Sequence, residues 1–331
     1  MTVAGIPTTV LLAPDSFKGT FSSTKVAAAL AAGVRAAGRP VDLCPVADGG
    51  EGTLTVLRDA MAADAFWATV HDPLGREVQA ELAIADGGRT AIVEAAAAAG
   101  LGLLAPRERD PIAASSFGVG ELIAAGVDAG AERILLGVGG TATTDGGSGA
   151  IRALRRRGGL RDAELVVLSD VRTPFEDAAR VFGPQKGAAP EDVRRLARRL
   201  RALAGRLPRD PRGRPMTGAA GGLAGGLWAA FDARLVSGAA FVLDALDFDA
   251  RMRRARAVVT GEGRLDLQSL SGKLVSEVAT RARQGGVPCH AVVGRRELDD
   301  FGLRVLDVQA VLEASTLRQI EAAGRKLADL L

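Results

Sequence analysis

Five segments of the sequence combine glycine with charged or hydroxyl side chains, and most of them follow a short apolar run that predicts a strand. The first, APDSFKG, brings Asp15, Ser16 and Lys18 within four residues. A carboxylate, a hydroxyl and an ammonium group together can hold a small oxygen-rich molecule. Ligands of open α/β sheets bind beyond the carboxyl ends of the strands, so we expect chemistry at these segments.

The second segment, PVADGGEGT, precedes a predicted helix and places Asp48 and Glu51 on either side of a Gly-Gly pair. Exposed amide groups at a helix start bind anions. Two acids at the same place indicate a general base or an Mg²⁺ ligand beside the anion. The alternative is an ordinary capped helix start.

The third segment, LLGVGGTATTDGGSG, is the richest in glycine. It resembles a GxGxxA dinucleotide fingerprint only weakly, because no acidic residue is evident after a second strand. Its amides and hydroxyls suit a triphosphate, and Asp145 suits a metal ion. We expect the phosphates to contact Gly139, Gly140, Thr141, Thr143, Gly146 and Gly147.

The last two segments carry cations. VFGPQKGA presents Lys186, which we expect to be exposed between a proline turn and a glycine. TGEGRLDLQSLSGK contributes Gly261, Glu262, Gly263, Arg264, Asp266 and Lys273. A P-loop requires GxxxxGK followed by Ser or Thr, and Leu274 breaks that pattern. Any nucleotide site is therefore predicted to be of another kind.

Residue usage supports phosphoryl transfer as the reaction class. The chain has 37 arginines, five lysines, no tyrosine and no asparagine, so arginine is its ordinary cation. A retained lysine at position 186 suits a transferring phosphoryl group, because its ammonium is compact. No Ser–His or Cys–His pair is evident, and phosphoryl transfer needs none.

Composition excludes several classes. The 331 residues are 47% hydrophobic and 24% charged, which is typical of a folded globular protein. No apolar run reaches 18 residues, and the first residues lack the basic start of a signal peptide. Cys44 and Cys289 form no zinc or disulfide pattern, and two histidines exclude an HExxH site. We expect a cytoplasmic protein without a membrane partner.

Two arginine runs raise the question of nucleic acid. They cover residues 152–157 and 194–206, and the second alternates leucine with arginine at helical spacing. Aromatic residues are only 4%, and no zinc finger or RNA-binding motif is present. We interpret the runs as solvated helix faces and expect no nucleic-acid partner.

Apolar periodicity predicts alternating strands and helices, and hence parallel sheets. The predicted strands are TTVLLA at the start of the chain, Val41–Val46, Thr90–Glu94, Arg133–Val138, Glu164–Ser169, Ala257–Thr260 and Val287–Val293, with a hairpin in Thr69–Ile84. The predicted helices are Ser22–Ala37, Glu51–Ala62, Phe117–Ala129 and Lys273–Gln284, and Met216–Gly226 is predicted to be a loop.

Six motifs in one order resemble the type I glycerate kinases, a glycerate 2-kinase-like family. They are APDSFKG, VADGGEGT, GVGGTATTDGGSG, FGPQKGA, GAAGGL and TGEGRLDxQSxxGK, and the resemblance runs from about Val10 to Val293. It implies a Rossmann- or flavodoxin-like α/β domain with a mostly parallel sheet, built from residues 1–65 and 236–331. A smaller mixed α/β domain, residues 66–235, would be inserted in it.

The resemblance also implies ATP and Mg²⁺, with D-glycerate as acceptor and 2-phosphoglycerate as product, and a homodimer is an option. We predict catalytic roles for Asp48, Lys186, Arg264 and Asp266, with Asp48 as the base and Asp266 as runner-up. The predicted substrate-binding residues are Asp15, Ser16, Lys18, Glu51 and Lys273. The glycines and threonines of the third segment, with Gly261 and Gly263, would bind ATP, and Asp145 and Glu262 the metal.

Some positions depart from the family pattern. Thr144 and Thr173 stand where the family usually has asparagine, and the connection between Ala150 and Glu164 is shorter. These departures leave open a kinase for another small hydroxy acid, a glycerate 3-kinase, or a nucleotide-binding protein without catalysis.

Overall fold

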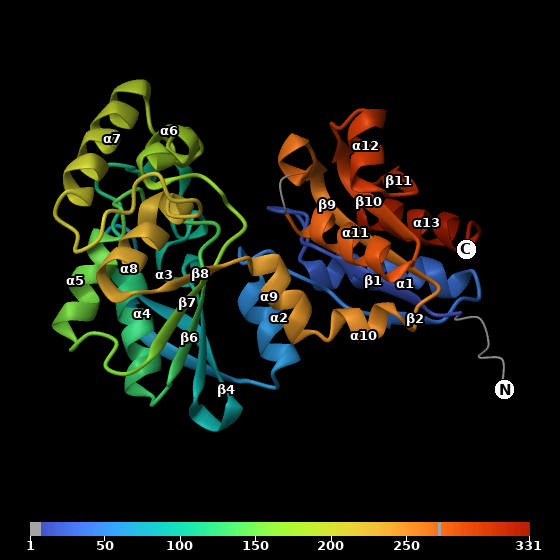
Figure 1. The fold of residues 1–331 in the computed structure, drawn as a ribbon, viewed down its shortest axis with the longest axis horizontal. Helices are drawn as coiled ribbons and strands as arrows, with labels where there is room; N and C mark the ends of the chain where they lie inside the picture. Colours follow the sequence, from blue (N-terminus) through green and yellow to red (C-terminus); the bar gives the residue numbers. More distant parts are fainter. Residues whose placement is uncertain (1–7, 271–272) are drawn as a thin grey trace. The chain divides into compact units, whose positions relative to one another are not determined.

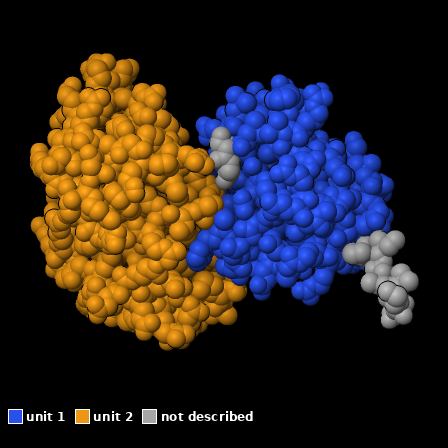
Figure 2. Space-filling model, in the orientation of Figure 1, with its two compact units in different colours: residues 1–48, 239–331 blue, residues 49–238 orange. Residues whose placement is uncertain are grey.

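The computed structural model describes residues 8–270 and 273–331. The chain forms two compact units, coloured separately in Figure 2: unit 1 holds residues 1–48 and 239–331, and unit 2 holds residues 49–238. Unit 1 is therefore built from both ends of the chain. No helix in the described ranges is long and apolar enough to cross a membrane.

Unit 1 is built on a parallel five-stranded sheet in the order β11-β10-β9-β1-β2 (Figure 1). Its strands are β1 (Val10–Pro14), β2 (Val41–Leu43), β9 (Ala257–Leu265), β10 (Cys289–Arg296) and β11 (Ala310–Glu313). Counted along unit 1, this is the flavodoxin-like order 2-1-3-4-5, in which the direction of winding reverses between β1 and β9. The predicted α/β class with a mostly parallel sheet is confirmed.

Helices cover both faces of this sheet. α1 (Ser23–Ala36) and α13 (Leu317–Ala328) bury Leu30 and Ile320 against one face. The other face packs against α9 (Gly238–Ala245), α10 (Phe248–Met252), α11 (Leu274–Gly285) and α12 (Asp300–Leu306). Apolar residues therefore occupy both faces of each central strand, as in parallel sheets generally.

Unit 2 is built on a mixed six-stranded sheet in the order β3-β4-β5-β6-β7-β8. Its strands are β3 (Asp64–His71), β4 (Glu77–Ala85), β5 (Thr90–Glu94), β6 (Arg133–Gly137), β7 (Glu164–Leu168) and β8 (Arg234–Val236). The predicted hairpin is the antiparallel pair β3–β4, whereas β5 to β8 run parallel. The second mixed α/β body is thus confirmed.

The helices of unit 2 enclose an apolar core on the sheet. They are α2 (Thr53–Ala60), α3 (Ala96–Ala99), α4 (Phe117–Asp128), α5 (Ser148–Arg156), α6 (Ala178–Phe182), α7 (Pro190–Ala204) and α8 (Leu223–Phe231). Because α2 packs on β4 and β5, the units divide at residues 48 and 49 rather than 65 and 66. Unit 2 is also the larger of the two, not the smaller; its status as an inserted domain stays a prediction.

Two predicted elements are wrong in extent. β9 continues to Leu265 because β10 pairs with it that far, so the first six residues of the fifth polar segment, 260–265, are strand rather than loop. The predicted loop Met216–Gly226 contains a 3₁₀ turn, Ala219–Gly222, and the first turn of α8. Gly222 supplies the positive φ, 89°, that starts this helix.

The α1–α13 contact generates a stability prediction. A Cβ atom on Gly33 would lie 1.9 Å from the backbone oxygen of Glu321, and one on Gly324 would lie 2.5 Å from that of Leu30. Gly33→Ala should therefore lower the free energy of unfolding by about 1–3 kcal/mol, because the helices must separate. Gly102→Ala is the control, since nothing lies within 4 Å of its Cβ position. Equal urea midpoints for the two variants would contradict this packing.

Candidate functional site

A cavity of about 440 Å³ lies in unit 1 where β1 and β9 end. This is the winding reversal of the sheet, the place where α/β proteins bind ligands. The cavity is lined by Asp15, Ser16, Phe17, Lys18, Thr20, Glu262, Gly263, Arg264, Asp266, Lys273, Gly294, Arg295 and Ser315. Two predicted segments from opposite ends of the sequence thus share one cavity.

The segment after β1 contributes a buried acid and a paired lysine. Burial and the nearby Asp48 raise the pKa of Asp15 well above its usual value, although Lys18 opposes them. Lys18 Nζ lies 2.7 Å from the Asp48 carboxylate. Burial acts to lower the pKa of Lys18, but Asp48 and Asp15 outweigh it, so this lysine stays cationic. The hydroxyl of Ser16 is buried without a partner in the described ranges, so it has a hydrogen bond to offer a ligand.

Glu262 is the second acid with a changed pKa in this cavity. Burial raises its pKa to about 7, although a hydrogen bond and nearby lysines oppose the shift. The buried Ser269 donates that hydrogen bond, 2.6 Å from its Oγ to Oε1 of Glu262. A carboxyl group that titrates near neutral pH can exchange a proton or accept a cation under ordinary conditions.

The rest of the fifth segment supplies cations at the cavity edge. Arg264 is exposed, and Lys273 Nζ donates to the Gln268 side chain at 3.0 Å. Asp266 accepts from the Gln268 amide at 2.8 Å. Gly263 lines the cavity, whereas Gly261 is buried in the sheet, where a Cβ would lie 2.1 Å from a backbone oxygen of β10. Close strand packing therefore explains Gly261 without a ligand.

In unit 2 the start of α2 was predicted to bind an anion through its backbone amides, but these amides already have a partner within the protein. The amides of Gly52 and Leu54 donate to the Glu94 carboxylate, at 3.1 to 3.3 Å. Glu94, at the end of β5, is buried, so it caps the helix and balances its positive end. Glu51 is exposed beside this cap.

Within the third segment, residues 135–149, the glycines at 139–140 and those at 146–147 differ in their hydrogen bonding. The amides of Gly139 and Gly140 make no hydrogen bond to another described residue, and Gly140 is exposed. The Gly146 amide instead donates to Gly221, and the Gly147 amide donates to Asp145. Of these four glycine amides, the two that can bind a phosphate are therefore those of Gly139 and Gly140.

Asp145 has a structural environment rather than that of a metal ligand. One carboxylate oxygen accepts from the amide and hydroxyl of Ser116 and from the Gly149 amide, at 2.9 to 3.0 Å. The other accepts from Gly147 at 3.0 Å. These bonds tie the start of α5 to α4 and occupy both carboxylate oxygens of Asp145 with donors of the protein.

Lys186 is buried, and its predicted exposure is wrong. It lies in the 3₁₀ turn Pro184–Lys186 and is 3% exposed. Its Nζ donates to the backbone oxygen of Thr143 at 2.5 Å and to Thr141 Oγ1 at 3.3 Å. Burial lowers the pKa of Lys186 to about 7, although Asp145 opposes the shift. The lysine therefore braces residues 141–143 from within.

Some functional candidates were missed from the sequence. Glu94 ends an apolar strand and gave no signal, because its partners are backbone amides. Ser269 lies inside the TGEGRLDxQSxxGK motif, so the motif itself was the available signal. Arg295 and Ser315 reach the cavity from the ends of β10 and β11, and only the sheet order reveals them.

Acids, cations and a hydroxyl without a partner in the described ranges lie at the winding reversal of this parallel sheet, an arrangement typical of α/β enzymes. No group of three or more His, Cys, Asp or Glu side chains in the described ranges could hold a metal by itself. The model of the glycerate kinase family matches residues 10–158 and 155–330. The chain belongs to the glycerate kinase family and is an enzyme of the kinase class.

Named relatives agree with this assignment. The glycerate kinase of Bacillus subtilis is 38% identical, over 86% of this chain and 84% of the relative. The glycerate 2-kinase of Escherichia coli is 35% identical, over 89% of this chain and 87% of the relative. A crystal structure of a Salmonella typhimurium LT2 protein assigned as glycerate kinase 2 covers 98% of both chains, with 32% identity and a TM-score of 0.80.

The buried lysine generates a pH prediction. The pKa of Lys186 is lowered from 10.5 to about 7 in the folded protein, so between these values the unfolded chain binds more protons. The free energy of unfolding should therefore gain a positive contribution from pH 7 to 10.5. Lys186→Met should remove that contribution, measured by urea denaturation at pH 7 and 9.5. The control is the exposed Lys326→Met, and equal pH slopes in both variants would refute the buried titration.

Proposed function

We propose that this enzyme transfers the γ-phosphoryl group of ATP to the 2-hydroxyl of D-glycerate, giving 2-phosphoglycerate, with Mg²⁺ assisting. The observation that carries the proposal is the unit 1 cavity, which combines Ser16, Lys18 and Arg264 with three carboxylates. Family membership and the name of the Escherichia coli relative support the substrate and the position phosphorylated.

Glycerate binding is assigned to the cations and the hydroxyl of the cavity. Arg264 is exposed and can bind the glycerate carboxylate through two parallel hydrogen bonds. Lys18 and Ser16 can hold the two hydroxyl groups, and Ser16 has no competing partner among the described residues. Lys273 at the rim adds a second cation for anionic substrates. Asp15 also lines this cavity. The substrate-binding role of Glu51, which belongs to unit 2, stays a prediction.

ATP binding is assigned to the start of the third segment. The amides of Gly139 and Gly140 are unpartnered, and the buried Thr143 hydroxyl also lacks a partner in the described chain. Lys186 and Thr141 hold this part in place, so we treat Lys186 as a positioning residue. Rigid, pre-arranged donors suit phosphoryl transfer, which depends on position and charge.

We assign the metal ion to Glu262. Magnesium usually binds one or two carboxylates together with substrate phosphates and water, so a full cluster of protein ligands is not required. Glu262 fits because its pKa of about 7 leaves it ionised just above neutral pH, in a cavity beside Asp15 and Asp266. The ion, when bound, neutralises the phosphate charge that develops during transfer.

Asp48 is the proposed base. As the glycerate oxygen forms a bond to the γ-phosphorus, the bond to ADP breaks and the hydroxyl proton passes to a carboxylate. Asp48 already accepts a hydrogen bond from Lys18. Because we assign Lys18 to glycerate binding, this contact would bring Asp48 close to the substrate. Asp266 is the runner-up, because it lines the cavity but is engaged by the Gln268 amide.

A direct assay tests the proposed function. The purified protein with ATP, Mg²⁺ and D-glycerate should release ADP and form 2-phosphoglycerate, distinguished from the 3-isomer by ³¹P and ¹³C NMR. EDTA should abolish turnover, and excess Mg²⁺ should restore it. Lactate, tartronate and glycerol are the control acceptors. Three outcomes would contradict the assignment: ADP release that does not depend on glycerate, 3-phosphoglycerate as the product, or faster turnover of another hydroxy acid.

The base assignment has its own variant. General-base help is worth about 10²- to 10⁴-fold in rate, so Asp48→Asn should lower kcat at least tenfold. Asparagine has the same shape as aspartate, so the melting temperature should change little. Asp266→Asn is the matched comparison and should keep more activity. The assignment moves to Asp266 if Asp48→Asn retains over a tenth of the wild-type kcat.

A further inference from the structure

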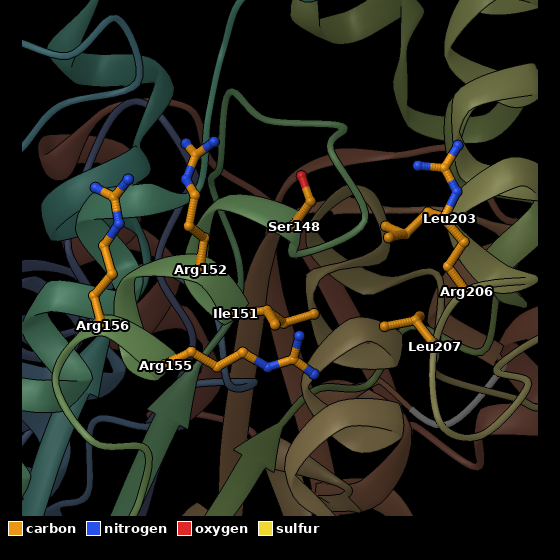
Figure 3. Close-up of a pocket in the computed structure, with 8 residues that line it drawn as sticks. All are labelled: Ser148, Ile151, Arg152, Arg155, Arg156, Leu203, Arg206 and Leu207. Carbon is orange, nitrogen blue, oxygen red and sulfur yellow. The ribbon is translucent and has the colours of Figure 1, made fainter.

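An arginine-lined cavity lies in unit 2, next to the end of the third segment, which contributes Ser148 to it. It measures about 480 Å³ and lies between α5 and the end of α7 with its following turn. We call it the arginine pocket. Its lining residues are Ser148, Ile151, Arg152, Arg155, Arg156, Leu203, Arg206 and Leu207, all labelled in Figure 3.

The pocket combines a strong positive charge with an apolar floor. Figure 3 shows the side chains of Ile151, Leu203 and Leu207 between the arginines of α5 and Arg206. Arg155 runs beneath Ile151 toward Leu207. A ligand seated there would touch apolar carbon with one part and guanidinium groups with another.

The four guanidinium groups are not neutralised by the protein. No ion pair to a carboxylate is formed by Arg152, Arg155, Arg156 or Arg206 in the described ranges. The neighbouring Arg157, by contrast, pairs with Asp128 at 2.9 Å. Like charges three and four residues apart on one helix repel, which an anion would relieve.

Local structure accounts for only part of this cluster. The negative end of α5 favours Arg155 and Arg156 in its last turn. Arg152 and Arg156 also lie over the Phe117 ring, 5.2 and 5.6 Å from its centre. Neither effect explains why Arg206, from the turn after α7, faces the same cavity.

We propose that the arginine pocket binds a nucleoside di- or triphosphate at a site additional to those of the proposed reaction. Guanidinium groups recognise phosphate oxygens through paired, charge-assisted hydrogen bonds. The floor of Ile151, Leu203 and Leu207 offers apolar contact to a base, and Ser148 offers a hydroxyl at the rim. Volume, charge and floor together match a phosphate chain attached to a flat organic group.

Photo-crosslinking tests this site directly. The full chain, without glycerate, is irradiated with 8-azido-ATP, and labelled peptides are mapped by mass spectrometry. Label is expected in residues 148–156 and 203–207 and should be competed by ATP. Arg155→Gln/Arg206→Gln should weaken competition by ATP at least tenfold. The control, Arg194→Gln/Arg198→Gln, removes two exposed charges of α7 outside the pocket and should leave it unchanged.

Inorganic tripolyphosphate is the second competitor. It should compete at least fivefold less well than ATP, because it lacks the group that would lie on the apolar floor. Label confined to other peptides, equal competition in the double variant, or equal loss in the control would overturn the proposal. Tripolyphosphate competing as well as ATP would overturn its nucleoside part. Glycerate phosphorylation by the same samples tests the proposed function separately.

Discussion

The pairing of β1 with β9 is the constraint on which unit 1 depends. These strands are separated by most of the sequence, yet they run parallel from Val10 and Ala257 to Pro14 and Gly261. The buried Thr260 hydroxyl adds a hydrogen bond to the Ala13 carbonyl oxygen, at 3.0 Å. This pairing joins the two chain ends into one sheet and places both polar segments at one cavity.

Glycine makes the necessary close approaches possible. A Cβ on Gly261 would meet a β10 oxygen, and in unit 2 one on Gly139 would lie 2.4 Å from the backbone of Gly50. Gly49 has a φ of 84°, and a Cβ atom added to it would lie 2.6 Å from the backbone oxygen of Leu168. Packing by itself therefore requires glycine at these positions.

Burial sets the electrostatics in both units. It raises the pKa of Asp15 and Glu262 in unit 1, and it lowers that of Lys186 in unit 2. Each shift means that folding pays to hold a polar group away from water. Thr144, where the family usually has asparagine, adds a buried hydroxyl without a partner among the described residues. Such costs are typical of functional sites.

The sequence by itself determined the alternation of strands and helices, the family and the polar segments to which we assign the chemistry. These follow from local periodicity and from motifs that stay together along the chain. The tertiary structure decided which segments meet. It buried Lys186, engaged Asp145 and the α2 amides with internal partners, and gathered the arginine pocket, because contacts between distant residues depend on sheet order and helix packing rather than on spacing.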